Sequence, residues 1–103
     1  MNAIFIYLTV PTSKEAKKIV ASLLAKKLIA CANILPHMES FYRWKGKIEH
    51  ANEVVVILKT RKTLFEKVKK DILENHSYEN PCIVALAIEK GHQPFLQWIR
   101  QQT

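Results

Sequence analysis

Residues 53–60 read Glu-Val-Val-Val-Ile-Leu-Lys-Thr, which is the strongest strand signal in the chain. Its run of β-branched residues favours extended backbone. The five central residues are all apolar and do not alternate with polar ones, a pattern typical of a strand that is covered on both faces. The sequence therefore predicts a central strand here, and the other elements can be placed around it.

A long hairpin is predicted on the N-terminal side of this strand. Residues 40–44 read Ser-Phe-Tyr-Arg-Trp, with alternate side chains on opposite faces. Lys45-Gly46 is suited to a two-residue hairpin turn, because glycine accepts positive φ. Residues 47–49 form the returning arm. We expect residues 50–52 (His-Ala-Asn) to interrupt that arm as a bulge.

Three more apolar runs predict the remaining strands. Residues 4–10 form the first, which Pro11 ends. Residues 29–35 form the second, which we expect Pro36 to stop, because proline cannot donate to a strand ladder. Residues 82–88 form the last strand, after a loop whose Asn-Pro step disfavours helix.

Three helices are predicted between and after these strands. The first opens at Thr12, with Glu15 three residues later as a capping box, and its apolar residues recur at spacings of three and four. The second covers residues 63–75 and repeats the capping-box spacing between its first residue and Glu66. Pro94 starts a short terminal helix.

The resulting order is β-α-β-β-α-β plus a terminal helix, which is the ferredoxin-like arrangement of the α+β class. We expect one domain over residues 1–103. Two helices would cover one face of a four-stranded antiparallel sheet, whereas the other face has little in the chain to cover it. Since several strands are apolar on both faces, the second face needs a partner, most simply another copy of the chain.

Composition narrows the function classes. The chain has 103 residues, 49% of them hydrophobic, and a net charge of +7. The lysines follow helical periodicity, and residues 53–60 lack the stacking aromatics of an RNA-recognition strand, so we expect no nucleic-acid partner. No apolar run is long enough to cross a bilayer, so we expect no membrane partner. The first residues do not resemble a signal peptide, and the two cysteines lie in apolar stretches, which predicts buried free thiols and a cytoplasmic protein.

Residue types and spacing leave several site hypotheses open. Cys31 is either a soft metal ligand or a small buried hydrophobe. His76 opens the loop after the second helix, with Glu79 at i+3, so the two either hold a metal or His76 simply suits the helix dipole. Glu53 and Lys59 share a strand face and either flank a ligand or face solvent or a neighbouring subunit. A Cys31–His76 nucleophile pair would require the two to meet in the fold, so we expect no enzyme.

The sequence resembles the divalent-cation tolerance (CutA) family over nearly its whole length. The matching stretches are Leu-Ile-Ala-Cys-Ala-Asn at 28–33, Ser-x-Tyr-x-Trp-x-Gly-Lys-Ile-Glu at 40–49, Glu53, Ile-Leu-Lys-Thr at 57–60, and His-Ser-Tyr-Glu-Asn-Pro at 76–81. The resemblance implies a tight homotrimer similar to the PII signalling proteins, a role in tolerance of divalent metals, and copper binding. It also implies an inter-subunit cleft lined by Cys31, Tyr42, Trp44, Glu53, Lys59, His76, Tyr78 and Glu79.

Two departures from the family pattern change the expected metal chemistry. Ser77 stands where the family often has proline, and Leu8 stands where some members have a further cysteine. With Cys31 as the remaining thiol, a metal site would depend on His76 and Glu79, which suit Cu(II) or zinc better than Cu(I). The sequence therefore predicts a non-enzymatic trimer that binds a divalent metal, copper or zinc, in or near inter-subunit clefts. The alternative is a PII-like sensor or scaffold, with Lys59 binding an anionic group between the walls formed by Trp44 and Tyr78.

Overall fold

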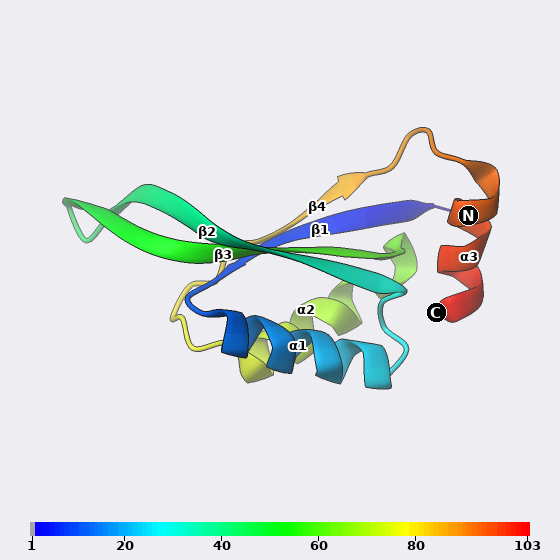
Figure 1. Ribbon diagram of the computed structural model, residues 1–103, viewed down its shortest axis with the longest axis horizontal. Coiled ribbons are helices and arrows are strands. Elements are labelled where there is room, and N and C mark those ends of the chain that lie inside the picture. The colour runs from blue at the N-terminus through cyan, green and yellow to red at the C-terminus, as the bar shows by residue number, and fades with distance from the viewer. Residues whose placement is uncertain (1) are drawn as a thin grey trace.

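The computed structural model describes residues 2–103 (Figure 1). The predicted order of elements is confirmed. The elements are β1 (Ala3–Val10), α1 (Ser13–Ala25), β2 (Cys31–Trp44), β3 (Lys47–Arg61), the 3₁₀ turn η1 (Lys62–Leu64), α2 (Phe65–Asn75), β4 (Ile83–Ala87) and α3 (Gln93–Gln102). Among residues 2–103, no helix is long and apolar enough to span a membrane.

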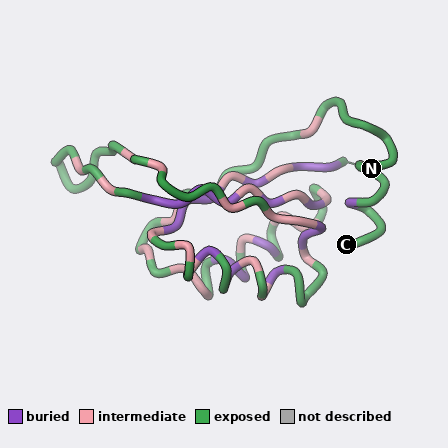
Figure 2. Tube along the Cα trace, in the orientation of Figure 1, coloured by how far each residue is buried: buried purple, intermediate pink, exposed green. Residues whose placement is uncertain are grey.

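The four strands form one antiparallel sheet in the order β2-β3-β1-β4, with α1 and α2 side by side on one face (Figure 1). This confirms the ferredoxin-like α+β architecture. Ile6 pairs with Leu58 on β3 and with Ala85 on β4. Alternate side chains of β1 and β3 point to the helices and are almost fully buried, so the main core lies between sheet and helices (Figure 2).

The hairpin of β2 and β3 extends well beyond the rest of the sheet (Figure 1). Both of its arms are longer than predicted, and two expectations about them are wrong. Pro36 does not stop β2, because β2 is an edge strand and the missing N–H removes no ladder bond that the sheet needs. Residues 50–52 pair regularly, and the irregularity lies on the other strand, as a register shift between Leu35 and Met38, which pair with Val55 and Glu53.

The turn at the hairpin tip is the predicted one. Lys45 and Gly46 have φ values of 50° and 81°. Positive φ at both central residues is the signature of the type I′ turn, whose twist matches that of the flanking strands.

The two predicted capping boxes have different outcomes. Thr12 Oγ1 accepts from the backbone N–H of Glu15 at 3.1 Å, so half of the first box is present. The Glu15 carboxylate turns away instead and accepts from the backbone N–H of Ser77 at 3.2 Å. The second box is wrong: Thr63 lies inside η1, and α2 starts at Phe65 without a side-chain cap.

The sheet face opposite α1 and α2 is only partly covered. α3 packs over one end of it, where Ile99 is buried with Ala3 and Ala30 in a second small core (Figure 1). Over the remainder, Leu35, Val84 and Leu86 are each close to half exposed, at 46%, 49% and 47%. We call this remainder the open face. It confirms that the chain leaves one apolar sheet face without a cover of its own.

The cysteines are free, but the expectation that both are buried is wrong. Cys31 is half-buried at the start of β2 and Cys82 is exposed. The strand predicted at 82–88 is shorter, at Ile83–Ala87, which leaves Cys82 in the preceding loop. Apolar runs in the sequence predict strands, but they do not predict which residues of those strands another element covers. The burial of the two cysteines could therefore not be predicted from them.

Candidate ligand cleft

A cleft of about 650 Å³ lies between the outer part of the hairpin, at residues 40–44, and the loop between α2 and β4. β1 contributes its floor and β2 the aromatic wall. The lining residues are Tyr7, Thr9, Ser40, Phe41, Tyr42, Arg43, Trp44, Glu53, Ser77, Tyr78, Glu79, Asn80 and Cys82.

The Glu53 carboxylate is the charged centre of the cleft. It is only 7% exposed and accepts a hydrogen bond from the Tyr78 hydroxyl at 2.6 Å. Burial, reinforced by this bond and by the charge of Glu53, raises the pKa of Tyr78 well above its ordinary value. Tyr78 therefore stays a neutral donor over the physiological range.

Cys82 lies on the same side of the cleft. Although Cys82 as a whole is exposed, partial burial of its thiol raises the pKa of that group, and the nearby charge of Glu53 adds to the effect. A raised pKa lowers the thiolate fraction, which is the reactive and metal-binding form. Cys82 is thus a neutral wall of the cleft rather than a nucleophile.

His76 holds the loop in place from behind the cleft. Its side chain is fully buried, and its Nε2 lies 2.8 Å from the backbone oxygen of Thr9. Its Nδ1 accepts from the backbone N–H of Tyr78 at 3.0 Å, which assigns the proton to Nε2. Glu15 Oε2 lies 3.4 Å from the same Nδ1. Both ring nitrogens are engaged, so His76 would have to give up a contact to bind a metal.

The eight residues expected to form the site fall into three places. Tyr42, Trp44, Glu53, Tyr78 and Glu79 line the cleft, and His76 supports it from behind. Cys31 and Lys59 lie opposite each other in the β2–β3 ladder, six residues along β3 from Glu53. Because a strand rises by about 3.3 Å per residue, Lys59 lies roughly 20 Å from Glu53 along β3.

Lys59 shares the open face with Glu53, as the spacing predicts, but does not line the cleft. Its amine donates to the side-chain oxygen of Asn33 instead. Cys31 and His76 likewise lie at opposite ends of the sheet, so they form no nucleophile pair.

A metal does not fit the residues of one chain. Among residues 2–103, no group of three or more histidine, cysteine, aspartate or glutamate side chains could hold an ion. Glu79 is exposed and Glu53 is engaged with Tyr78, which leaves two carboxylates without an imidazole or thiolate to join them. Zinc and copper sites in proteins normally take three or four such ligands.

The sequence reasoning missed several lining residues. Tyr7 and Thr9 follow the period-two pattern of β1 onto the open face, so alternation could have identified them. Glu15 was assigned to a helix cap, and its contact with the loop 62 residues later has no local signal.

Comparison with known proteins gives consistent matches. The profile of the family described as "CutA1 divalent ion tolerance protein" matches residues 4–102. A divalent-cation tolerance protein CutA from Archaeoglobus fulgidus is 50% identical over 95 residues, covering 92% of each chain. Protein CutA from Homo sapiens is 40% identical over 97 residues, covering 94% of this chain but 54% of the human one. The chain thus spans nearly all of the archaeal relative and about half of the human one.

Solved structures show the same fold. The structure described as the periplasmic divalent cation tolerance protein CutA from Archaeoglobus fulgidus superposes with a TM-score of 0.94 at 47% identity, covering 97% of each chain. CutA1 from Oryza sativa superposes with a TM-score of 0.97 at 36% identity, covering all of this chain and 94% of the rice one.

Proposed function

The chain belongs to the CutA1 divalent ion tolerance family, and we propose that it is a non-enzymatic homotrimer. In this proposal the protein takes part in tolerance of divalent metals, and its ligand clefts are completed between subunits. The family establishes the connection to divalent-cation tolerance. Trimeric assembly, direct metal binding and the identity of the metal are our proposals.

The open face is the observation that carries the proposal. Its exposed leucine and valine side chains lie on the central part of the sheet, and the strand register puts Tyr42 and Trp44 on the same face further along the hairpin. Exposed apolar surface of this kind is costly in water and marks a protein interface. A closed symmetric assembly of identical chains is the simplest cover. The number three rests on the resemblance to trimeric relatives of the PII type.

Metal binding in this proposal depends on the neighbouring subunit. One chain supplies an exposed carboxylate from Glu79 at the rim of the cleft and a buried one from Glu53. Assembly would bring side chains from a second copy against this rim. Carboxylate donors suit Cu(II) and zinc better than Cu(I), which prefers thiolates.

The test is calorimetric titration of Cu(II) and Zn(II) into protein whose mass has been measured by light scattering. The Glu79→Gln and Cys31→Ser variants are compared with Glu89→Gln, an exposed carboxylate outside the cleft. The proposal predicts saturable binding of one ion per chain that Glu79→Gln weakens and Glu89→Gln does not. Equal affinity in all four proteins, or no saturable binding, would contradict direct metal binding in the cleft.

The alternative function is a PII-like sensor or scaffold that binds a small molecule. The observation in its favour is the cleft itself, which combines five aromatic side chains with one buried carboxylate. Such a mixture of apolar walls and few polar groups is typical of small-molecule sites. Lys59 would contribute only from another subunit, since it lies outside the cleft of its own chain. A thermal-shift screen of metabolites tests this function, because a ligand specific to the folded state raises apparent stability.

We also propose that the protein works in the cytoplasm. Its two cysteines are free, which suits a reducing compartment. Relatives are described as periplasmic or chloroplastic, so location varies among them. Fractionation of cells that express the natural gene, followed by immunodetection, decides the point.

A further inference from the structure

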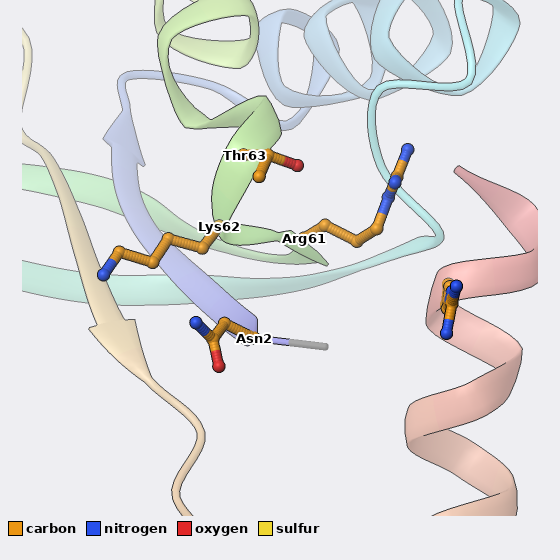
Figure 3. Close-up of a pocket in the computed structure, with 5 residues that line it drawn as sticks. Asn2, Arg61, Lys62 and Thr63 are labelled. Atoms are coloured by element: carbon orange, nitrogen blue, oxygen red, sulfur yellow. The ribbon is translucent and has the colours of Figure 1, made fainter.

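A second cavity, of about 300 Å³, lies far along β3 from the cleft, where β3 runs into η1 (Figure 3). The start of β1 and the last turns of α3 complete it. Its lining consists of hydrogen-bond donors from four elements or their ends: Asn2, Arg61, Lys62, Thr63 and Arg100.

The cavity concentrates positive charge. Three of its five described lining residues are cationic, and no carboxylate is among them. Within residues 2–103, no aspartate or glutamate side chain pairs with Arg61, Lys62 or Arg100, whereas Lys26 pairs with Asp71 and Lys69 with Glu66 on the helices. Like charges gathered around one hollow repel each other, so the arrangement favours an anionic occupant.

Arg61 is held in place by contacts that leave donors free. Its Nε donates to Thr103 Oγ1 at 3.0 Å, and its Nη2 donates to the backbone oxygen of Thr103 at 2.8 Å. Roughly three of its five N–H donors remain. A guanidinium fixed in this way loses less side-chain entropy on binding and matches the oxygens of a phosphate group.

The donors are spread along the cavity rather than focused at one point. Figure 3 shows the side chains of Lys62 and Arg61 extending to opposite sides, with Arg61 extending toward α3. Arg100 of α3 also lines the cavity. We propose that this pocket binds a small anion with several phosphate groups, such as a polyphosphate or the phosphate chain of an ester. Because no aromatic side chain is among the described lining residues, recognition rests on the phosphates.

The test titrates tripolyphosphate into the protein in a metal-free buffer with chelator, so that its outcome is independent of the proposed metal binding. The variants are Lys62→Gln and Arg100→Gln, which remove exposed charges, and the matched control is Lys70→Gln on the outer side of α2. Arg61 is left intact because it holds Thr103. Removing one charge-assisted contact should weaken binding by about tenfold, while the control should change it by less than about twofold.

Three further outcomes decide the proposal. ATP binding as tightly as tripolyphosphate would support recognition through the phosphates. Absence of saturable tripolyphosphate binding, or equal loss in Lys70→Gln, would overturn the proposal, since the latter indicates a general effect of net charge. The protein could instead sediment with vesicles of anionic lipid, lose this sedimentation in both site variants, and fail to bind tripolyphosphate. That result would overturn the proposal in favour of a lipid headgroup.

Discussion

At the scale of single residues, the hydrogen bond from Tyr78 to the buried Glu53 carboxylate is the central polar contact of the cleft. Replacing Tyr78 with phenylalanine leaves the buried carboxylate without its donor at 2.6 Å. We expect the free energy of unfolding to fall by about 1–3 kcal/mol, the usual cost of an unsatisfied buried group. Denaturant unfolding measures the change, with Tyr42→Phe as the control because Tyr42 is largely exposed. Equal stability of the two variants would mean that the bond contributes little.

The same pair predicts how stability depends on alkaline pH. The pKa of Tyr78 is raised in the folded state, first by burial and then by Glu53. The unfolded chain therefore releases the Tyr78 proton first, at about pH 10. The contribution to stability is complete below that pH and is lost as pH rises above it. Unfolding curves from about pH 8 to about pH 11 should show a steeper decline for the natural protein than for Tyr78→Phe. Parallel declines would contradict the assignment.

His76 is the residue whose role in the structure differs most from the role that the sequence predicts. Its position before Glu79 fits a metal ligand, yet its ring joins β1 to the loop through two backbone contacts. We expect His76→Ala to lower the free energy of unfolding by about 2 kcal/mol or more, because two buried backbone groups lose their partner. Limited proteolysis should then cut the loop at 76–82 faster.

The control for His76 is His50→Ala, whose exposed ring contacts the side chains of Glu39 and Phe41 on the hairpin. If both histidine variants resisted protease equally, the anchoring role would be wrong. No spacing in the sequence identifies this role, since Thr9 is 67 residues away and contributes only its backbone oxygen. Local patterns predict ligands from side-chain type, but they do not predict which backbone group a side chain meets.

At the scale of elements, periodicity and turn residues predicted every strand and helix, whereas their ends depend on neighbours. Pro36 was expected to end a strand, but proline is tolerated where a strand has no neighbour on that side, and the sequence does not say that β2 is an edge. Thr63 has the spacing of a cap, yet the chain leaving β3 first forms η1, which moves the start of α2 to Phe65. Strand order and the path between elements are tertiary properties.

The hairpin tip is the element whose sequence and geometry agree most closely, and it gives a clean test. A Cβ added at Gly46 would meet nothing within 4 Å, so Gly46→Ala changes only the cost of φ +81°. We expect a loss of about 1 kcal/mol in the free energy of unfolding, with a smaller loss for Gly46→Asn, which tolerates this region better. Urea unfolding at one fixed protein concentration measures both. A loss as large for asparagine as for alanine would contradict a type I′ turn at this site.

At the scale of the whole molecule, the mismatch between apolar strands and a single layer of helices was visible in the sequence, and the open face confirms it. The composition of the cleft was only partly predictable. Residues of the hairpin and of the loop after α2 line one cleft, whereas Cys31 and Lys59 lie outside it, at the other end of the β2–β3 ladder. A sequence motif predicts that residues share a site only where its segments meet within one chain. The residues of a cleft between chains need not follow any spacing in the sequence.

Assembly provides the last prediction, through Trp44. Its side chain stands on the cleft side of the hairpin, is 37% exposed in the single chain, and has the size and amphipathic character of residues that dominate interfaces. If the hairpin packs on a neighbouring copy, Trp44→Ala should weaken association by about 2 kcal/mol or more, and light scattering should show a lower mass on dilution. The matched control is Ile48→Ala, a 72% exposed apolar residue of opposite parity that pairs with Arg43 and does not line the cleft. A trimer mass preserved on dilution in Trp44→Ala but lost in Ile48→Ala would place the interface on the other side of the hairpin, since successive residues of a strand face opposite ways.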